Sequence, residues 1–212
     1  MSKRRLRLVK TAVWFALWVI GAGLILNSRG FWRLFFPLHY QPTLERYGSE
    51  YGVDPLLLAA VIRAESKYHP KARSQAGALG LMQIVPETGA WVAEQIGLKN
   101  FGPDELLAPE TNIRIGAWYL GHLLDQFHGD LVLALAAYNS GRGNVLGWIG
   151  EQKARGRVLT IEDIPFPETK VYVQKVLRNY YWYRKIYAPA EKRGIFWSWV
   201  EKEKRGQMLP RE

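Results

Sequence analysis

The chain of 212 residues contains no cysteine. It can therefore form neither a disulfide framework nor a thiolate metal site. Its four histidines lack the spacing of metal ligands relative to one another. The sequence also has no glycine-rich phosphate loop and no internal repeat. We expect the protein to use no metal and no cofactor.

A basic central domain is also missing. The formal net charge is +10, but the first ten residues carry +5 without an acid, and the segment from Arg184 onward carries +4. The middle of the chain is left with about one positive charge. A nucleic-acid-binding domain would be expected to carry a basic face, so we expect no nucleic-acid partner.

One long apolar run follows the basic start. Every residue after Thr11 and up to Leu26 is apolar. With Val9 and a snorkelling Lys10 the run has about 27 Å of helix at 1.5 Å per residue, against a hydrocarbon core of about 30 Å. The run predicts a transmembrane signal anchor over residues 11–28.

A cleaved signal peptide is the alternative, because it also has a basic start and an apolar stretch. No small-x-small cleavage pattern follows the run, where Asn27, Ser28 and Arg29 stand instead. We therefore favour a retained anchor. Because basic residues crowd its N-terminal side, we expect a cytoplasmic N-terminus and a domain on the extracytoplasmic side of the cell membrane.

The remaining chain can bury one good core, since 48% of its residues are hydrophobic. Helical spacing of apolar residues, punctuated by proline and glycine, predicts a mainly α domain. Further helices are predicted to begin at Pro86, at Pro109, after the N-cap Asp130 and at about Glu168. The helix after Asp130 is almost continuously apolar and should lie in the middle of the domain, whereas residues 151–160 should be charged and exposed. The tail carries aromatic and basic residues, and either contact with a membrane surface or packing on the domain would suit it. The predicted parts are a basic cytoplasmic flank (1–10), the anchor (11–28), a juxtamembrane connector (29–42), a helical domain (43–188) and a basic amphiphilic tail (189–212).

An acidic residue, Glu65, falls on the apolar face of a predicted helix. Asp54 followed by Pro55 predicts the helix start, because an N-cap carboxylate accepts unpaired backbone N–H groups and proline is tolerated at the first position. The helix can hardly pass His69, because Pro70 disfavours helical geometry before it. The residues that predict its core face are Leu58, Val61 and Ile62.

This position predicts a raised pKa for Glu65. Partial burial and the negative end of the helix dipole both disfavour its charged form. A carboxylic acid that keeps its proton near neutral pH suits general acid catalysis. The alternative is a glutamate that turns out to solvent or pairs with Arg63 or Lys67.

A series of short motifs resembles the soluble-type lytic transglycosylases, the lysozyme-like enzymes that cleave bacterial peptidoglycan. The resemblance covers roughly residues 47–187. Each motif is short, and their common order is what makes the series specific. The motifs are Glu65-Ser66, Ser74, Gly80-Leu81-Met82-Gln83, Ala137-Tyr138-Asn139-Ser140-Gly141, Glu168-Thr169 and Tyr172-Val173.

The resemblance implies a lysozyme-like helical domain in which Glu65 is the catalytic acid and then the base. It would cleave the bond between N-acetylmuramic acid and N-acetylglucosamine in peptidoglycan glycan strands and leave a 1,6-anhydro end. Two rivals stay open. A goose-type lysozyme would use water on the same fold, and a non-catalytic peptidoglycan-binding module of an envelope protein complex would need no acid.

The resemblance also implies roles for the other motif residues. Gln83 and the backbone near Met82 would bind substrate, although ordinary core packing suits the Met82 side chain equally well. Ser74 would place its hydroxyl near the acid. Glu168 would contact substrate or, alternatively, cap the last helix.

Three further motif residues complete the predicted site. Tyr138 and Tyr172 would position the sugar and the acid, and Asn139 would fix the local backbone.

Overall fold

A computed structural model describes residues 3–189, and from residue 13 onward it describes the side chains as well, those of residues 22 and 27 excepted. Within this range the chain is helical, and its only β pairings are two isolated bridges. The chain divides into two compact units between Leu38 and His39. The predicted tail at 189–212 lies outside the described residues, except for its first residue.

The first unit contains two helices, α1 (Lys3–Asn27) and α2 (Arg29–Phe35). The predicted anchor at 11–28 is therefore helical over nearly all its length, while the predicted connector begins with a helix. Among the side chains described, no single helix is long and apolar enough to cross a membrane. Val13–Leu26 and Arg29–Phe35 together have the length and composition, with a bend of 61° between them.

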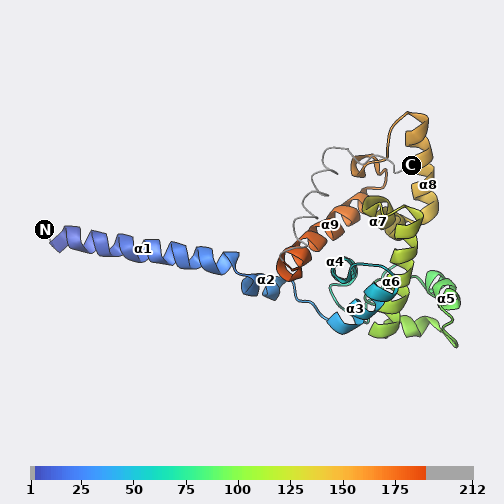
Figure 1. Ribbon diagram of the computed structural model, residues 1–212, viewed down its shortest axis with the longest axis horizontal. Helices are drawn as coiled ribbons and strands as arrows, with labels where there is room; N and C mark the ends of the chain where they lie inside the picture. Colours follow the sequence, from blue (N-terminus) through green and yellow to red (C-terminus); the bar gives the residue numbers. More distant parts are fainter. Residues whose placement is uncertain (1–2, 190–212) are drawn as a thin grey trace. The chain divides into compact units, whose positions relative to one another are not determined.

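The second unit packs its helices around α4 (Pro55–Glu65), which Figure 1 shows between α9 and the pair α3 and α6. The predicted starts of α4, α5, α6 and α7 are confirmed, and α9 begins at Pro167, one residue before its predicted start. The predicted domain boundary at residue 43 falls inside α3. The other helices are α3 (Gln41–Glu50), α5 (Pro86–Gln95), η1 (Pro103–Leu107), α6 (Pro109–Gln126), α7 (Leu131–Ser140), α8 (Arg142–Ala154), η2 (Ile161–Asp163) and α9 (Pro167–Tyr187).

Helix α4 is buried on nearly every side. Residues 57–62 and Ala64 are all buried, because α9 and α3 both pack on the helix. The single core-facing stripe predicted from the sequence is therefore too narrow. Helix α7 matches its prediction as a central apolar helix, with Leu131, Val132 and residues 134–137 buried against α6, α8 and α9.

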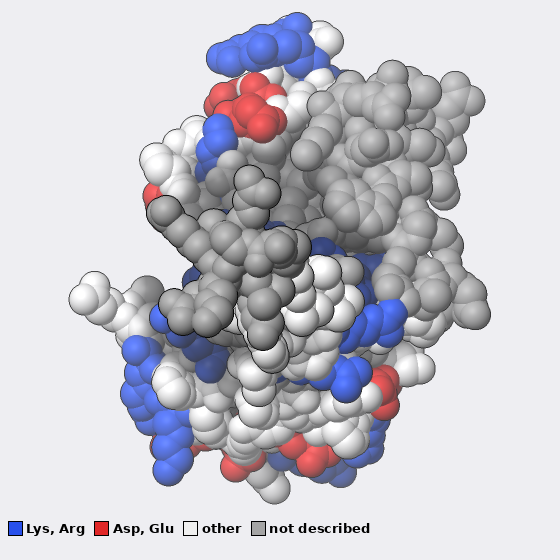
Figure 2. All heavy atoms as spheres, turned by 90° about the vertical axis from the view of Figure 1, so that its left-hand side faces the viewer, with Lys and Arg blue, Asp and Glu red and all other residues white. Residues whose placement is uncertain are grey.

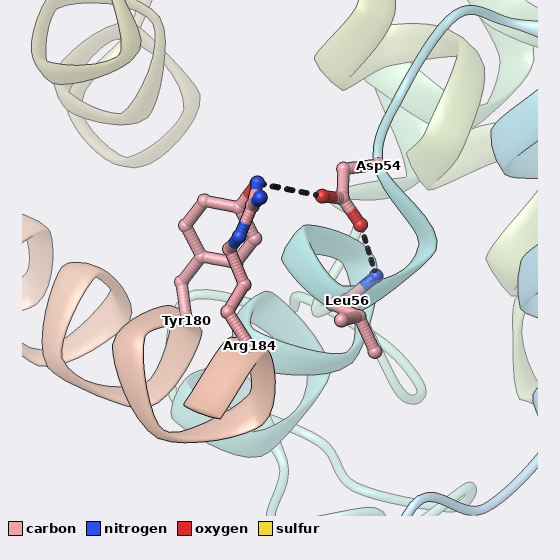
Figure 3. A network of polar contacts seen from close by, with 4 residues as sticks. All are labelled: Asp54, Leu56, Tyr180 and Arg184. Atoms are coloured by element: carbon pink, nitrogen blue, oxygen red, sulfur yellow. Dashed lines mark hydrogen bonds and ion pairs between the residues drawn. The ribbon is translucent and has the colours of Figure 1, made fainter. Parts of the chain in front are cut away.

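Asp54 joins the start of α4 to the end of α9 (Figure 3). One carboxylate oxygen accepts the Leu56 N–H at 2.8 Å, which confirms the predicted N-cap. The other oxygen accepts the Tyr180 hydroxyl at 2.7 Å and an Arg184 N–H at 3.3 Å. Asp54 thus fixes the position of the start of α4 relative to the end of α9.

We expect Asp54→Ala to lower the free energy of unfolding by about 3 kcal/mol, since it removes an N-cap and charge-assisted hydrogen bonds. Asp54→Asn is the matched control, because asparagine is also a good N-cap, and it should cost only about 1 kcal/mol. Urea unfolding followed by circular dichroism measures both. Equal stability of Asp54→Ala and wild type would contradict a clamping role.

A loop of residues 66–85 leaves the C-terminal end of α4 and returns along α6. It contains the two isolated bridges, Arg73 with Leu79 and Leu79 with Ile84. Lys67, Tyr68 and Gln83 adopt positive φ angles of 51°, 67° and 50°, a region that non-glycine residues rarely occupy. The loop therefore needs strong tertiary contacts to hold its shape.

Asn112 of α6 supplies those contacts. Its side chain is fully buried, accepts the Met82 N–H at 2.7 Å, and donates to the carbonyl oxygens of Leu79 at 2.9 Å and Leu106 at 2.8 Å. Gly80 lies against the same contact at φ 77°, where a Cβ atom would come within 2.1 Å of the Leu106 oxygen. Only glycine fits there, so the loop is held tightly against α6.

Charges on the surface are mixed. Along the lower margin of the face in Figure 2, Lys and Arg side chains lie among Asp and Glu side chains. The segment predicted to be charged and exposed, residues 151–160, is mostly exposed, but α8 extends into it to Ala154. Gln152 and Leu159 are buried there.

Candidate active site

Glu65 is the last residue of α4, and its side chain is part-buried. Burial raises the pKa of its carboxyl from the ordinary 4.5 to about 7, while the Tyr172 hydroxyl and the charge of Lys175 act in the opposite direction. The helix end adds to the rise, because its carbonyl groups disfavour a negative charge. The alternative of a solvent-exposed glutamate is wrong, and Glu65 enters no ion pair with Arg63 or Lys67 among the salt bridges of the described residues.

Tyr138 of α7 and Tyr172 of α9 lie beside this carboxyl. Burial raises the pKa of both phenols well above 10, and the nearby Glu65 charge raises them further. The Tyr138 hydroxyl donates to the Met82 carbonyl at 2.9 Å. The Tyr172 hydroxyl is buried close to Glu65 without reaching hydrogen-bond geometry with any described residue. Both tyrosines are therefore neutral hydroxyl groups next to the acid.

Lys175 is a part of the site that the sequence analysis did not identify. It stands one turn after Tyr172 on α9, and its ammonium group donates to the Ala64 carbonyl at the end of α4. One turn further along α9, Asn179 donates to the Ala60 carbonyl at 3.3 Å. Lys175 thus holds the last turn of α4 and places a positive charge near Glu65, where it lowers the carboxyl pKa.

The loop brings Met82 and Gln83 to the same region. The Met82 side chain is fully buried against Gly116, and its N–H and carbonyl groups are bonded to Asn112 and Tyr138. Core packing is thus the role that the structure favours for its side chain. The Gln83 amide donates to the Gly80 carbonyl at 2.8 Å and holds the loop. Its carbonyl oxygen accepts no hydrogen bond within the described part of the chain.

The remaining predicted residues lie in the loop, near the end of α7 and at the start of α9. Ser74 is exposed, and its hydroxyl accepts the Ala78 N–H at 3.0 Å, so its placement near Glu65 stays a prediction. Asn139 accepts the Thr169 hydroxyl at 2.8 Å, which ties the end of α7 to the start of α9. Glu168 is exposed in the first turn of α9. The alternative prediction that Glu168 caps this helix is wrong, because the N-cap residue is Phe166.

No group of three or more His, Asp or Glu residues in the described part of the chain could hold a metal ion. The chemistry that the arrangement offers is proton transfer by one carboxyl group with two phenols beside it. A helical domain with one such acid at the end of a central helix agrees with the lysozyme-like class that the motif series implies.

Comparison with known proteins agrees with this class. Residues 42–161 match the transglycosylase SLT domain, and the chain belongs to that family. It is 40% identical to the soluble lytic murein transglycosylase of Escherichia coli K12 over 151 residues. This match covers 70% of the chain and 23% of that protein. It is 37% identical over 127 residues to membrane-bound lytic murein transglycosylase D of the same strain. That match covers 58% of the chain and 27% of the relative.

Solved structures give the same result. An inactive mutant of the lytic transglycosylase Slt from Pseudomonas aeruginosa matches with a TM-score of 0.68 and 38% identity, over 74% of this chain and 26% of that one. A complex of the 70-kDa soluble lytic transglycosylase with bulgecin A matches with a TM-score of 0.70 and 36% identity. This match covers 75% of this chain and 26% of the transglycosylase in that complex. The chain spans about a quarter of the length of these relatives.

Proposed function

We propose that this protein is a membrane-anchored lytic transglycosylase that cleaves the glycan strands of peptidoglycan with Glu65 as its acid and base. The observation that carries the proposal is the Glu65 carboxyl, part-buried at the end of α4 with its pKa raised to about 7. Membership of the SLT family supports the substrate class. The inactive Pseudomonas aeruginosa relative differs by replacement of a glutamate with glutamine, which agrees with a single essential acid.

The reaction starts from protonated Glu65. Its proton passes to the oxygen that links N-acetylmuramic acid to N-acetylglucosamine, and the bond between that oxygen and the muramic C1 breaks. The muramic N-acetyl oxygen stabilises the positive charge at C1, as in substrate-assisted glycosidases. Glu65, now a carboxylate, takes the proton of the muramic C6 hydroxyl, whose oxygen bonds to C1. The product has a 1,6-anhydro ring, and no water is consumed.

The other site residues position these groups. Tyr138 and Tyr172 stay neutral, so they offer hydroxyl groups to the sugar without adding charge beside the acid. We propose that the side-chain carbonyl oxygen of Gln83 accepts a sugar N–H or hydroxyl, since its amide nitrogen is already bonded to the loop. Glu168 and Ser74 are both exposed, and we propose that they contact glycan outside the buried part of the site.

The membrane part of the proposal concerns the first unit. Trp14, Trp18 and Leu24 are 73%, 69% and 69% exposed there. Large apolar side chains that are exposed together on one helix need an apolar environment. We propose that residues 11–28 anchor the protein with its N-terminus in the cytoplasm and its catalytic domain outside. Alkaline carbonate extraction of cell membranes tests this, since an anchored protein stays in the pellet and a cleaved one is released.

Product analysis tests the proposed reaction. Digestion of purified peptidoglycan in water labelled with heavy oxygen should give muropeptides with anhydro ends and no label. Labelled reducing ends would indicate a goose-type lysozyme instead. Binding to peptidoglycan without any cleavage would indicate a non-catalytic module of an envelope complex.

The rate should fall as pH rises through the Glu65 pKa. Because the first step needs protonated Glu65, kcat/KM is expected to fall about tenfold per pH unit above about pH 7. Release of soluble fragments from purified peptidoglycan measures the rate, with circular dichroism at each pH as the control for folding. A rate that stays constant from about pH 6 to 9 would contradict the assignment.

Lys175→Met should shift the dependence of kcat/KM on pH to higher pH. Removing the positive charge near Glu65 raises the carboxyl pKa further, so the alkaline fall in rate should move to higher pH. Lys170→Met is the matched control, because Lys170 also lies on α9 and donates to a backbone carbonyl, that of Glu162, at 2.9 Å. An unchanged midpoint in Lys175→Met would show that this charge does not act on Glu65.

A further inference from the structure

We propose that Trp91, Trp118 and His122 form an aromatic platform that binds sugar rings of the glycan strand beyond the bond being cleaved. This inference rests on the proposed function for its ligand. It assigns a further binding surface, on α5 and α6, which includes none of the motif residues.

The platform is built from two helices that lie side by side (Figure 1). Trp118 and His122 stand one turn apart on α6, and their rings stack with centroids 5.0 Å apart and planes at 6°. Trp91 of α5 meets both rings edge-on, at 5.2 Å from Trp118 and 5.4 Å from His122. Three rings from two helices therefore form one contiguous cluster.

Ring contacts connect the platform to the candidate active site. Tyr119, next to Trp118 on α6, lies 6.2 Å from the Trp91 ring and 5.4 Å from the Tyr138 ring. Tyr138 in turn lies close enough to Glu65 for that carboxylate to raise its pKa. A chain of aromatic contacts thus leads from the acid to the platform, so the two lie in neighbouring parts of the same domain.

The rings are not needed to fill the core. Trp91 remains 39% exposed although it contacts aromatic rings on α6, and Trp118 and His122 are each partly exposed. The buried side of α5 is supplied by its neighbours Val92 and Ala93, at 0% and 2% exposure. Large aromatic side chains that keep exposed surface next to a binding site are typical of ligand contacts.

A glycan strand is the ligand that fits these features. The faces of pyranose rings present C–H groups, which pack on the electron-rich faces of aromatic rings, and this contact needs no charge. A polymer whose reacting bond lies at Glu65 also has further sugars on either side of that bond. The platform would therefore add affinity for long strands and leave the reacting sugars unaffected.

Binding without turnover tests the platform. The full chain carrying Glu65→Gln is titrated calorimetrically with a disaccharide and a hexasaccharide of β-1,4-linked N-acetylglucosamine. Adding Trp118→Leu or Trp91→Leu, which keep apolar volume but remove the ring, should weaken hexasaccharide binding about tenfold and leave disaccharide binding unchanged. Trp182→Leu, on α9, is the matched control and should change neither.

The outcomes separate this inference from the proposed function. Unchanged hexasaccharide binding in both variants, equal weakening for both ligands, or no hexasaccharide binding by the parent protein would each overturn the platform. If Trp91→Leu fails to fold by circular dichroism, Trp118→Leu carries the test. Absence of cleavage by the wild type, with hexasaccharide binding still dependent on Trp118, would refute the proposed reaction alone.

Discussion

Replacing Glu65 by glutamine is expected to lower the rate of peptidoglycan cleavage by about three orders of magnitude. Glutamine keeps the size and the polar end of the side chain but cannot donate a proton to the glycosidic oxygen or accept one from the C6 hydroxyl. A zymogram on purified cell wall, with release of soluble muropeptides as the quantitative assay, measures the loss. Glu151→Gln, an exposed position on α8, is the matched control and should retain full activity.

The same substitution should leave the protein folded and stabilise it at alkaline pH. Because the folded-state pKa of Glu65 is raised from 4.5 to about 7, its contribution to stability is complete below pH 4.5 and is lost as pH rises through 7. This amounts to about 3 kcal/mol for a shift of this size. Glu65→Gln carries no such penalty, so above pH 7 it should unfold at higher urea than wild type. Activity above a tenth of wild type in a folded Glu65→Gln would contradict the acid assignment.

Asn112→Leu should cause the largest loss of stability that the structure predicts. Leucine has a similar size but leaves the Met82 N–H and the carbonyls of Leu79 and Leu106 buried without their partner. At about 1 to 3 kcal/mol for each unpaired group, we expect a loss of about 4 kcal/mol in the free energy of unfolding. This is a large share of the roughly 5–15 kcal/mol available to a domain.

Urea unfolding measures the effect, and Asn144→Leu is the control. Asn144 is exposed on α8 and makes one hydrogen bond, to the Ser140 carbonyl at 2.7 Å, so its replacement should cost less than about 1 kcal/mol. Equal costs at the two positions would mean that the loop does not depend on Asn112. We also expect reduced cleavage by folded Asn112→Leu, because the Gly80–Gln83 segment would lose its fixed position.

The sequence predicted the parts of the site that depend on local signals. The N-cap Asp54 and Pro55 set the start of α4, while Pro70 gave only a limit for its end, and α4 stops at Glu65. Family motifs added Tyr138 and Tyr172, which the fold brings to Glu65 from α7 and α9.

Other parts of the site could not be predicted because they depend on contacts between distant residues. Lys175 reaches the Ala64 carbonyl from 111 residues away, and Asn112 reaches Met82 from 30 residues away. Neither residue is distinguished by its own helix, where a lysine or an asparagine usually faces solvent. The sequence spacing indicates only that Lys175 lies on the same face of its helix as Tyr172, about one turn later.

Packing favours a core role for the Met82 side chain, and the start of α9 excludes an N-cap role for Glu168, while substrate contact by either residue stays a prediction. Gly116 leaves room for the Met82 sulfur in the core, and this glycine could not be paired with Met82 before the fold was known. Glu168 lost its capping role because α9 begins at Pro167, so that Phe166 occupies the N-cap.

Direct titration of the Glu65 carboxyl tests the central claim most closely. Carbon NMR of protein labelled at its glutamate carboxyl groups, with Glu65→Gln to assign the signal, gives the midpoint for this one side chain. The structure predicts a midpoint near pH 7. A midpoint near 4.5, the ordinary value of an exposed glutamate, would contradict the account of how this protein carries its catalytic proton.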